Sequence, residues 1–101
     1  DQLAIDNAIY NSKLNGCSIP FISAKSFSTN QFFDTVIANI LSSTLINLSP
    51  IFNAVTKKRL VLCGILDDQV DQIIKEYSKW IELELINNMS GWNLLAGKLK
   101  L

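Results

Sequence analysis

Two apolar runs and the segment between them, DTVIANILSSTLINLSPIFNAVTKKRLVLCGI over residues 34–65, decide the fold of this chain. Residues 34–40 and 60–65 have continuously apolar centres, which is typical of strands that are covered on both faces. Residues 42–55 carry apolar side chains at helical spacing around an internal Pro50, which predicts a kinked helix or two shorter helices. A strand, a helix and a second strand predict a right-handed parallel crossover.

On the N-terminal side of this unit, residues 2–15 have the spacing of an amphipathic helix, and Asn15-Gly16 is typical of a helix end. Residues 18–23 are a short strand candidate that contains Pro20, so we expect an edge position. We expect residues 24–33 to form a loop.

On the C-terminal side, residues 67–79 predict a third helix. Residues 81–85 and 92–101 alternate in polarity on either side of a predicted turn at 89–91, so they predict an antiparallel pair, with Trp92 as a core anchor. The fold class is therefore α/β, with a mostly parallel sheet, helices on its faces and an antiparallel C-terminal pair.

The composition excludes several classes of function. The chain has 101 residues, enough for one domain, and nine basic residues balance nine acidic ones. A nucleic-acid arm or a polybasic membrane module needs a basic excess, and no apolar run is long enough to span a membrane. The chain has no histidine, which excludes a Ser-His-Asp triad and imidazole metal ligands. Cys17 and Cys63 are isolated, which favours the reducing cytoplasm.

Asn39 is the candidate binding residue, because it ends a predicted parallel strand. Ligands of open α/β sheets bind outside the carboxyl ends of the strands, and an amide can hold an amine or an adenosyl group without adding charge. The alternative is that Asn39 caps the following helix or closes a turn. Gly64 ends the next strand, where it either lets a ligand approach the backbone or forms a turn.

The other charged groups favour structural roles. Lys57-Lys58-Arg59 is more typical of a solvated connection than of a phosphate site. The three aspartates within residues 67–71 are typical of a helix first turn rather than of a metal site. Glu82 and Glu84 have no partner that would make them a catalytic acid and base. We therefore expect no catalytic side chain and no metal ligand.

Four stretches of the chain resemble the ribosomal protein L11 methyltransferase family, a group of class I methyltransferases. They are DQLAIDNA at 1–8, followed by Asn11, Asn15 and Gly16; VIANIL at 36–41, followed by Leu45, Leu48 and Ser49-Pro50-Ile51; LCGILDDQ at 62–69; and GWNLLA at 91–96. The third departs from the family's usual wording at Cys63, where Ser is common. The resemblance runs from residue 1 to residue 101 and identifies the chain as the C-terminal portion of the methyltransferase domain.

The resemblance implies S-adenosylmethionine as cofactor, an L11-like ribosomal protein as the substrate that is methylated on amines, and Asn39 as a cofactor-binding residue. It also implies a partial Rossmann-like sheet, strands three to seven of the usual seven, in which the glycine-rich cofactor loop and the first two strands lie outside residues 1–101. The strand at 34–40 would then be an exposed apolar edge. We expect the isolated chain to be inactive. The alternative is a non-catalytic module that pairs with a separate cofactor-binding half, or with itself through this edge.

Overall fold

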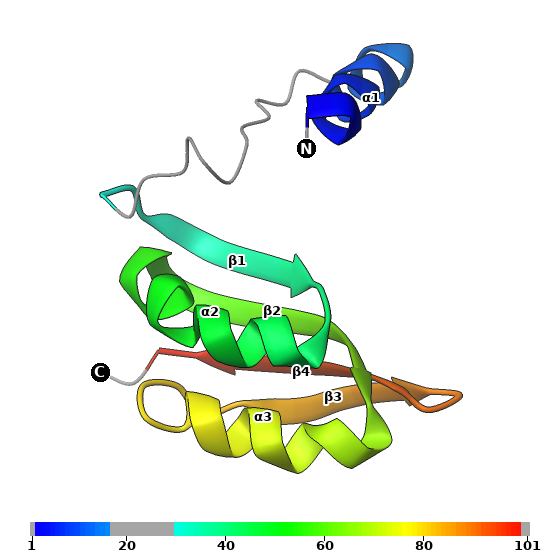
Figure 1. Cartoon of the computed structure of the whole chain (residues 1–101). Coiled ribbons are helices and arrows are strands. Elements are labelled where there is room, and N and C mark those ends of the chain that lie inside the picture. The colour runs from blue at the N-terminus through cyan, green and yellow to red at the C-terminus, as the bar shows by residue number, and fades with distance from the viewer. Residues whose placement is uncertain (1, 17–29, 100–101) are drawn as a thin grey trace.

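The computed structural model describes residues 2–16 and 30–99 of the chain, and Figure 1 shows their arrangement. The four strands of this part form one sheet in the order β1-β2-β4-β3, in which β1 and β2 are parallel and the other two contacts are antiparallel. This confirms the predicted α/β class with an antiparallel C-terminal pair. The elements are α1 (Gln2–Leu14), β1 (Phe33–Asn39), α2 (Ser42–Val55), β2 (Thr56–Leu66), the 3-10 helix η2 (Asp67–Gln69), α3 (Val70–Tyr77), β3 (Glu84–Met89) and β4 (Trp92–Lys98).

Helices α2 and α3 cover one face of the sheet, and the core lies between them and the strands (Figure 1). Two hydrogen bonds connect the helical layer: the Tyr77 hydroxyl donates to the Leu45 carbonyl oxygen at 2.5 Å, and the Trp80 indole N–H donates to Ser49 Oγ at 3.0 Å. Both join groups far apart in the sequence, so they fix how α3 lies against α2. The fully buried side chains of this core are Leu45, Leu60, Leu62, Ile65, Ile73, Tyr77, Ile81 and Leu95.

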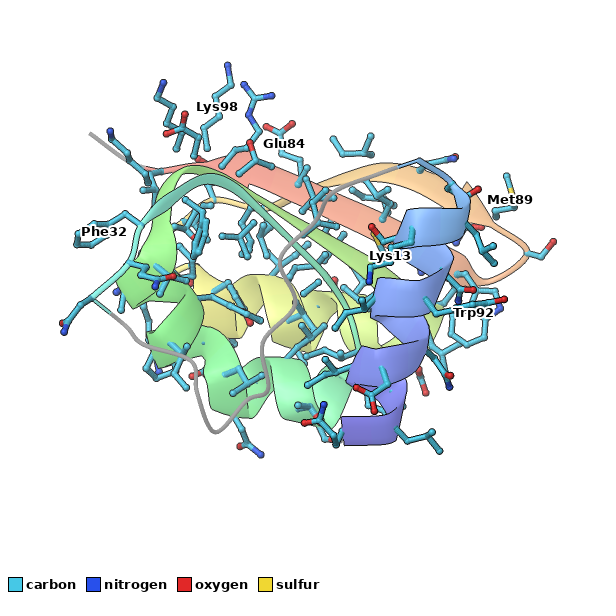
Figure 2. All side chains as sticks on the ribbon, turned by 90° about the horizontal axis from the view of Figure 1, so that it is seen from above. Lys13, Phe32, Glu84, Met89, Trp92 and Lys98 are labelled. Atoms are coloured by element: carbon cyan, nitrogen blue, oxygen red, sulfur yellow. The ribbon has the colours of Figure 1, made fainter. Side chains whose placement is uncertain are left out.

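The opposite face of the sheet is open in the described part of the chain. Ala38 and Leu62 are buried against the helices, so their strand neighbours Ile37 and Cys63 point to the other side. Ile37 is 68% exposed. Helix α1 lies beyond the β1 edge instead of over this face, and none of its side chains is buried (Figures 1 and 2).

One sequence prediction about the centre of the chain is wrong, and one alternative of a second prediction is also wrong. Residues 57–59 are part of β2 and not a connection, because Arg59 is paired with Thr35 on one side and Lys98 on the other. Hydrogen bonds from two neighbouring strands therefore outweigh the polarity of these side chains. Residues 42–55 form one helix, α2, that runs through the exposed Pro50, so the predicted alternative of two shorter helices is wrong, although proline removes one helical hydrogen bond.

The C-terminal third also differs from its prediction in detail. The third helix begins as η2 and ends at Tyr77, two residues earlier than predicted. The following strand begins at Glu84, whereas Ile81 forms only an isolated bridge to Leu99. Trp92 is 56% exposed, so it is not a core anchor.

The predicted turn between the last two strands is confirmed. Ser90 and Gly91 both have positive φ, 53° and 88°, as a two-residue type I′ hairpin turn requires. The predicted helix at 2–15 and its end at Asn15-Gly16 are also confirmed, with Gly16 at φ 69°. The strand candidate at 18–23 lies outside the described residues. No helix in the described part is long and apolar enough to cross a membrane.

Candidate functional site

The carboxyl ends of the parallel strands β1 and β2 bring Asn39 and Gly64 together. Asn39 ends β1, where it is exposed and in register with Cys63. A Cβ atom at Gly64 would lie 2.5 Å from Oδ1 of Asn39, so the amide of Asn39 occupies the space directly over this glycine. The side chain at position 39 therefore lies across the end of β2, and it reaches the edge at which an open α/β sheet binds ligands.

Gly64 lies at a bulge within β2, which neither of the sequence alternatives described. Between Leu62 and Ile65 the pairing with β4 shifts, so that β2 contains one more residue than its partner over this interval. Gly64 has a φ of +75°, which L side chains rarely adopt. The glycine is needed twice, once for this backbone conformation and once because the Asn39 amide leaves no room for a Cβ.

A hollow of about 180 Å³ opens next to this pair, between the start of α2 and the end of β2. Its polar wall contains a hydrogen bond in which Ser42 Oγ donates to Gln69 Oε1 at 2.6 Å. This bond occupies the Gln69 oxygen and leaves the amide N–H groups of Gln69 as donors. The residues that line the hollow are Leu41, Ser42, Ser43, Gly64, Leu66, Gln69 and Trp92.

A second polar network fixes the strand ends beside the hollow. Asp67 Oδ1 accepts hydrogen bonds from Nδ2 of Asn88 at 2.7 Å and from Nδ2 of Asn93 at 2.8 Å. Asn93 is 3% exposed and also donates to the Ile65 carbonyl oxygen at 2.9 Å. Asp67 therefore connects η2 to β3 and β4. The described residues contain no group of three or more side chains that could hold a metal ion.

The chemistry of this edge is that of binding and orientation. Every side chain that lines the hollow is uncharged, so within the described residues the hollow offers hydrogen-bond donors and acceptors but no acid or base. The sequence prediction located Asn39 at this edge but missed Ser42 and Gln69, and it assigned Trp92 to the core. The spacing of Gln69 after Gly64, within the LCGILDDQ stretch, was the available signal for Gln69.

Comparison with known proteins gives consistent results. The family model described as ribosomal protein L11 methyltransferase (PrmA) matches residues 1–100. A ribosomal protein L11 methyltransferase from Methylobacillus flagellatus is 37% identical over 99 residues, which are 96% of this chain and 33% of that protein. A protein of the same name from Dechloromonas aromatica is 35% identical, and the match also covers 96% of this chain and 33% of that protein. The chain thus spans about a third of the length of these curated relatives.

The structural comparison agrees at the level of the fold. A crystal structure described as ribosomal protein L11 methylase from Lactobacillus delbrueckii subsp. bulgaricus matches with a TM-score of 0.88 and 23% sequence identity. The match covers 100% of this chain and 55% of that one. It therefore supports a partial Rossmann-like arrangement of the sheet and its helices.

Proposed function

This chain belongs to the ribosomal protein L11 methyltransferase family, and we propose that it is the C-terminal portion of the methyltransferase domain of such an enzyme. The complete enzyme uses S-adenosylmethionine to methylate amines of an L11-like ribosomal protein. The glycine-rich cofactor loop and the first two strands of the sheet lie outside residues 1–101. The observation that carries the proposal is the exposed Asn39 amide, which lies over Gly64 beside an uncharged hollow at the carboxyl edge of β1 and β2.

These residues fit the cofactor and acceptor site of such an enzyme. S-adenosylmethionine, when bound, supplies an activated methyl group on a sulfonium. Asn39 offers both a donor and an acceptor for an adenosyl or amino group, and Gln69 offers further donors. Leu41 and Leu66 provide apolar wall for the aliphatic part of an amine-bearing side chain. No carboxylate in the described lining stabilises the ammonium form of the amine, so the lining does not oppose the loss of the proton that must precede methylation.

The proposal includes inactivity of the isolated chain. The described residues form one side of the site, and positioning accounts for most of what a protein contributes to a cofactor reaction. Transfer therefore requires the rest of the enzyme. The proposed location is the cytoplasm, which the two isolated cysteines favour.

The test combines the 101-residue chain with the remaining two thirds of the Methylobacillus flagellatus relative, either fused or co-expressed. Activity is measured as transfer of a radiolabelled methyl group from S-adenosylmethionine to purified L11. Asn39→Ala should lower kcat/KM by about tenfold or more, because loss of one hydrogen bond to a charged or polarised ligand costs about 1.5–3 kcal/mol. The matched control Asn53→Ala, on the exposed surface of α2, should leave the activity unchanged.

Two results would contradict the proposal. If Asn39→Ala retains the parent kcat/KM in an active assembly, Asn39 does not belong to the site. If the isolated monomeric chain binds S-adenosylmethionine with micromolar affinity in a calorimetric titration, the chain does not need the remaining part for cofactor binding.

The second candidate function is a non-catalytic binding module. The β1 edge favours it, because β1 pairs only with β2 among the described strands and exposes Phe33 and Ile37. Such a module would pair with a separate cofactor-binding half or with a second copy of itself. An assembly that forms stably but transfers no methyl group would favour this function over catalysis.

A further inference from the structure

A second hollow lies at the opposite end of β2 from Asn39. Its volume is about 290 Å³, and it is lined by Lys57, Lys58, Arg59, Lys98 and Leu99. Residues 57–59 lie near the start of β2, whereas the Asn39 amide lies over Gly64 near the other end of that strand. The two hollows are therefore separate sites.

Two of the cations around this hollow lie directly opposite each other in the sheet and repel each other. Arg59 and Lys98 are register partners on the antiparallel strands β2 and β4, and like charges directly opposite each other destabilise a sheet. Lys57 lies two residues before Arg59, at the irregular start of β2 where the register with β1 shifts, and it lines the same hollow. The net charge of the whole chain is zero, so this positive charge is a local concentration.

The carboxylates of the described residues do not neutralise the cluster. Lys58 pairs with Asp34, at 3.9 Å between exposed side chains, but no described carboxylate pairs with Lys57, Arg59 or Lys98. Glu84 and Lys98 both point away from the helical face (Figure 2), yet they form no ion pair. No described carboxylate therefore offsets the repulsion between Arg59 and Lys98, and a bound anion would offset it.

We propose that this hollow binds a phosphate group. The guanidinium of Arg59 presents a planar fork that matches phosphate oxygens, and the ammonium groups of Lys57 and Lys98 add point charges from two strands. A phosphate dianion would offset the like-charge pair, so binding also stabilises the fold. The group belongs either to a small phosphorylated molecule or to the backbone of an RNA, since both present the same oxygens.

The experiment titrates the 101-residue chain with inorganic phosphate and, separately, with a short single-stranded RNA. Each titration is run at constant ionic strength, and the RNA titration is repeated at several salt concentrations. Binding is followed by calorimetry and by the thermal unfolding midpoint. Arg59→Gln and Lys98→Gln should each weaken binding roughly tenfold, the loss expected for one charge-assisted hydrogen bond. The matched control Lys75→Gln removes the same charge from the exposed surface of α3 and should change nothing.

The pattern of results identifies the source of the phosphate. Binding of inorganic phosphate alone supports a small phosphorylated ligand. Tight binding of RNA supports an RNA backbone if it depends on salt as expected for phosphate contacts. The slope of the logarithm of the binding constant against the logarithm of the salt concentration should then become shallower by about 0.7 for each cation removed. The proposal is overturned if neither probe binds, or if Lys75→Gln weakens binding as much as Arg59→Gln and Lys98→Gln do. In the absence of any anion, Arg59→Gln and Lys98→Gln should have thermal unfolding midpoints no lower than that of the parent. This result would show that both variants remain folded.

Discussion

At the scale of single residues, the candidate site depends on one contact, the Asn39 amide over Gly64. The sequence predicted both residues at strand ends, because each follows an apolar run. It could not predict the contact, since the contact requires the β2 bulge between Leu62 and Ile65, and the bulge depends on pairing with β4. The same limit explains Trp92, whose exposure is set by its place after the hairpin turn and not by its own hydrophobicity.

Gly64→Ala tests this contact. The substitution should lower the free energy of unfolding by about 2 kcal/mol or more, because a positive φ and a close steric contact both act against the methyl group. In an Asn39→Ala background the cost should fall to about 1 kcal/mol, the strain of the backbone alone. Urea unfolding of the four proteins measures this cycle.

Gly91→Ala is the control for the Gly64 cycle, because Gly91 has a φ of +88° but a Cβ there would meet only an ordinary contact, at 3.8 Å. Its cost should not depend on Asn39. An equal cost of Gly64→Ala with and without the Asn39 side chain would show that the amide does not occupy the space over the glycine.

Because of Tyr77, the free energy of unfolding should depend on pH in the alkaline range. Burial, and secondly the charge of Glu76, raise the pKa of Tyr77 well above its usual value. Since the folded pKa lies above the unfolded value of about 10, the stabilisation is complete below pH of about 10 and is lost as the pH rises further. Tyr77→Phe should reduce this alkaline decline.

The same variant has a second effect at neutral pH. It removes the hydrogen bond to the Leu45 carbonyl and should cost about 1 kcal/mol. Urea unfolding at several pH values measures both effects, and Tyr10→Phe, on the exposed α1, is the control. A parent and a Tyr77→Phe variant with the same alkaline decline would show that another group causes it.

At the scale of elements, the interiors of β2 and α2 were easier to predict than their ends. The apolar centre of β2 was clear from residues 60–65, but its start at Thr56 depends on hydrogen bonds from β1 and β4, which a local pattern does not contain. Helix α2 shows the same effect: its burial against the sheet and α3 holds one helix through Pro50.

The β1 edge carries a prediction about association. The isolated chain should associate at high concentration, because apolar side chains along an unpaired strand favour pairing with another chain. Ile37→Lys should shift the chain to monomer, since a charge on β1 would replace an apolar contact with the side chains of the added strand. The matched change on the other edge strand, Ile86→Lys on β3, should not.

Light scattering coupled to size exclusion measures the mass of each protein over a range of concentrations. A parent chain that stays monomeric at every concentration would contradict association through β1. Equal effects of Ile37→Lys and Ile86→Lys on the measured mass would show that the added positive charge itself, and not its position on the β1 edge, prevents association.

At the scale of the whole molecule, the described helices cover only one face of the sheet. The sequence predicted strands buried on both faces, and the apolar side chains for two faces are present, but the described helices α2 and α3 supply cover for one. The described strands have the order β1-β2-β4-β3, and both contacts of β4 are antiparallel. The sequence could not predict which surfaces are open, because a local apolar pattern does not show which elements pack against each face.

Cys63 reports on the open face, because its half-buried thiol points away from α2 and α3. In a Cys17→Ser background, Cys63 should react readily with a thiol reagent in the isolated chain. Addition of the remaining two thirds of a relative should slow this reaction roughly tenfold or more, because access would then require local opening of the assembly. Unfolding in urea should restore the fast rate, which confirms that the thiol itself is intact. If the reaction is as fast in the assembly as in the isolated chain, the remaining part does not cover this face, and the chain would not complete its sheet in the way that the family assignment implies.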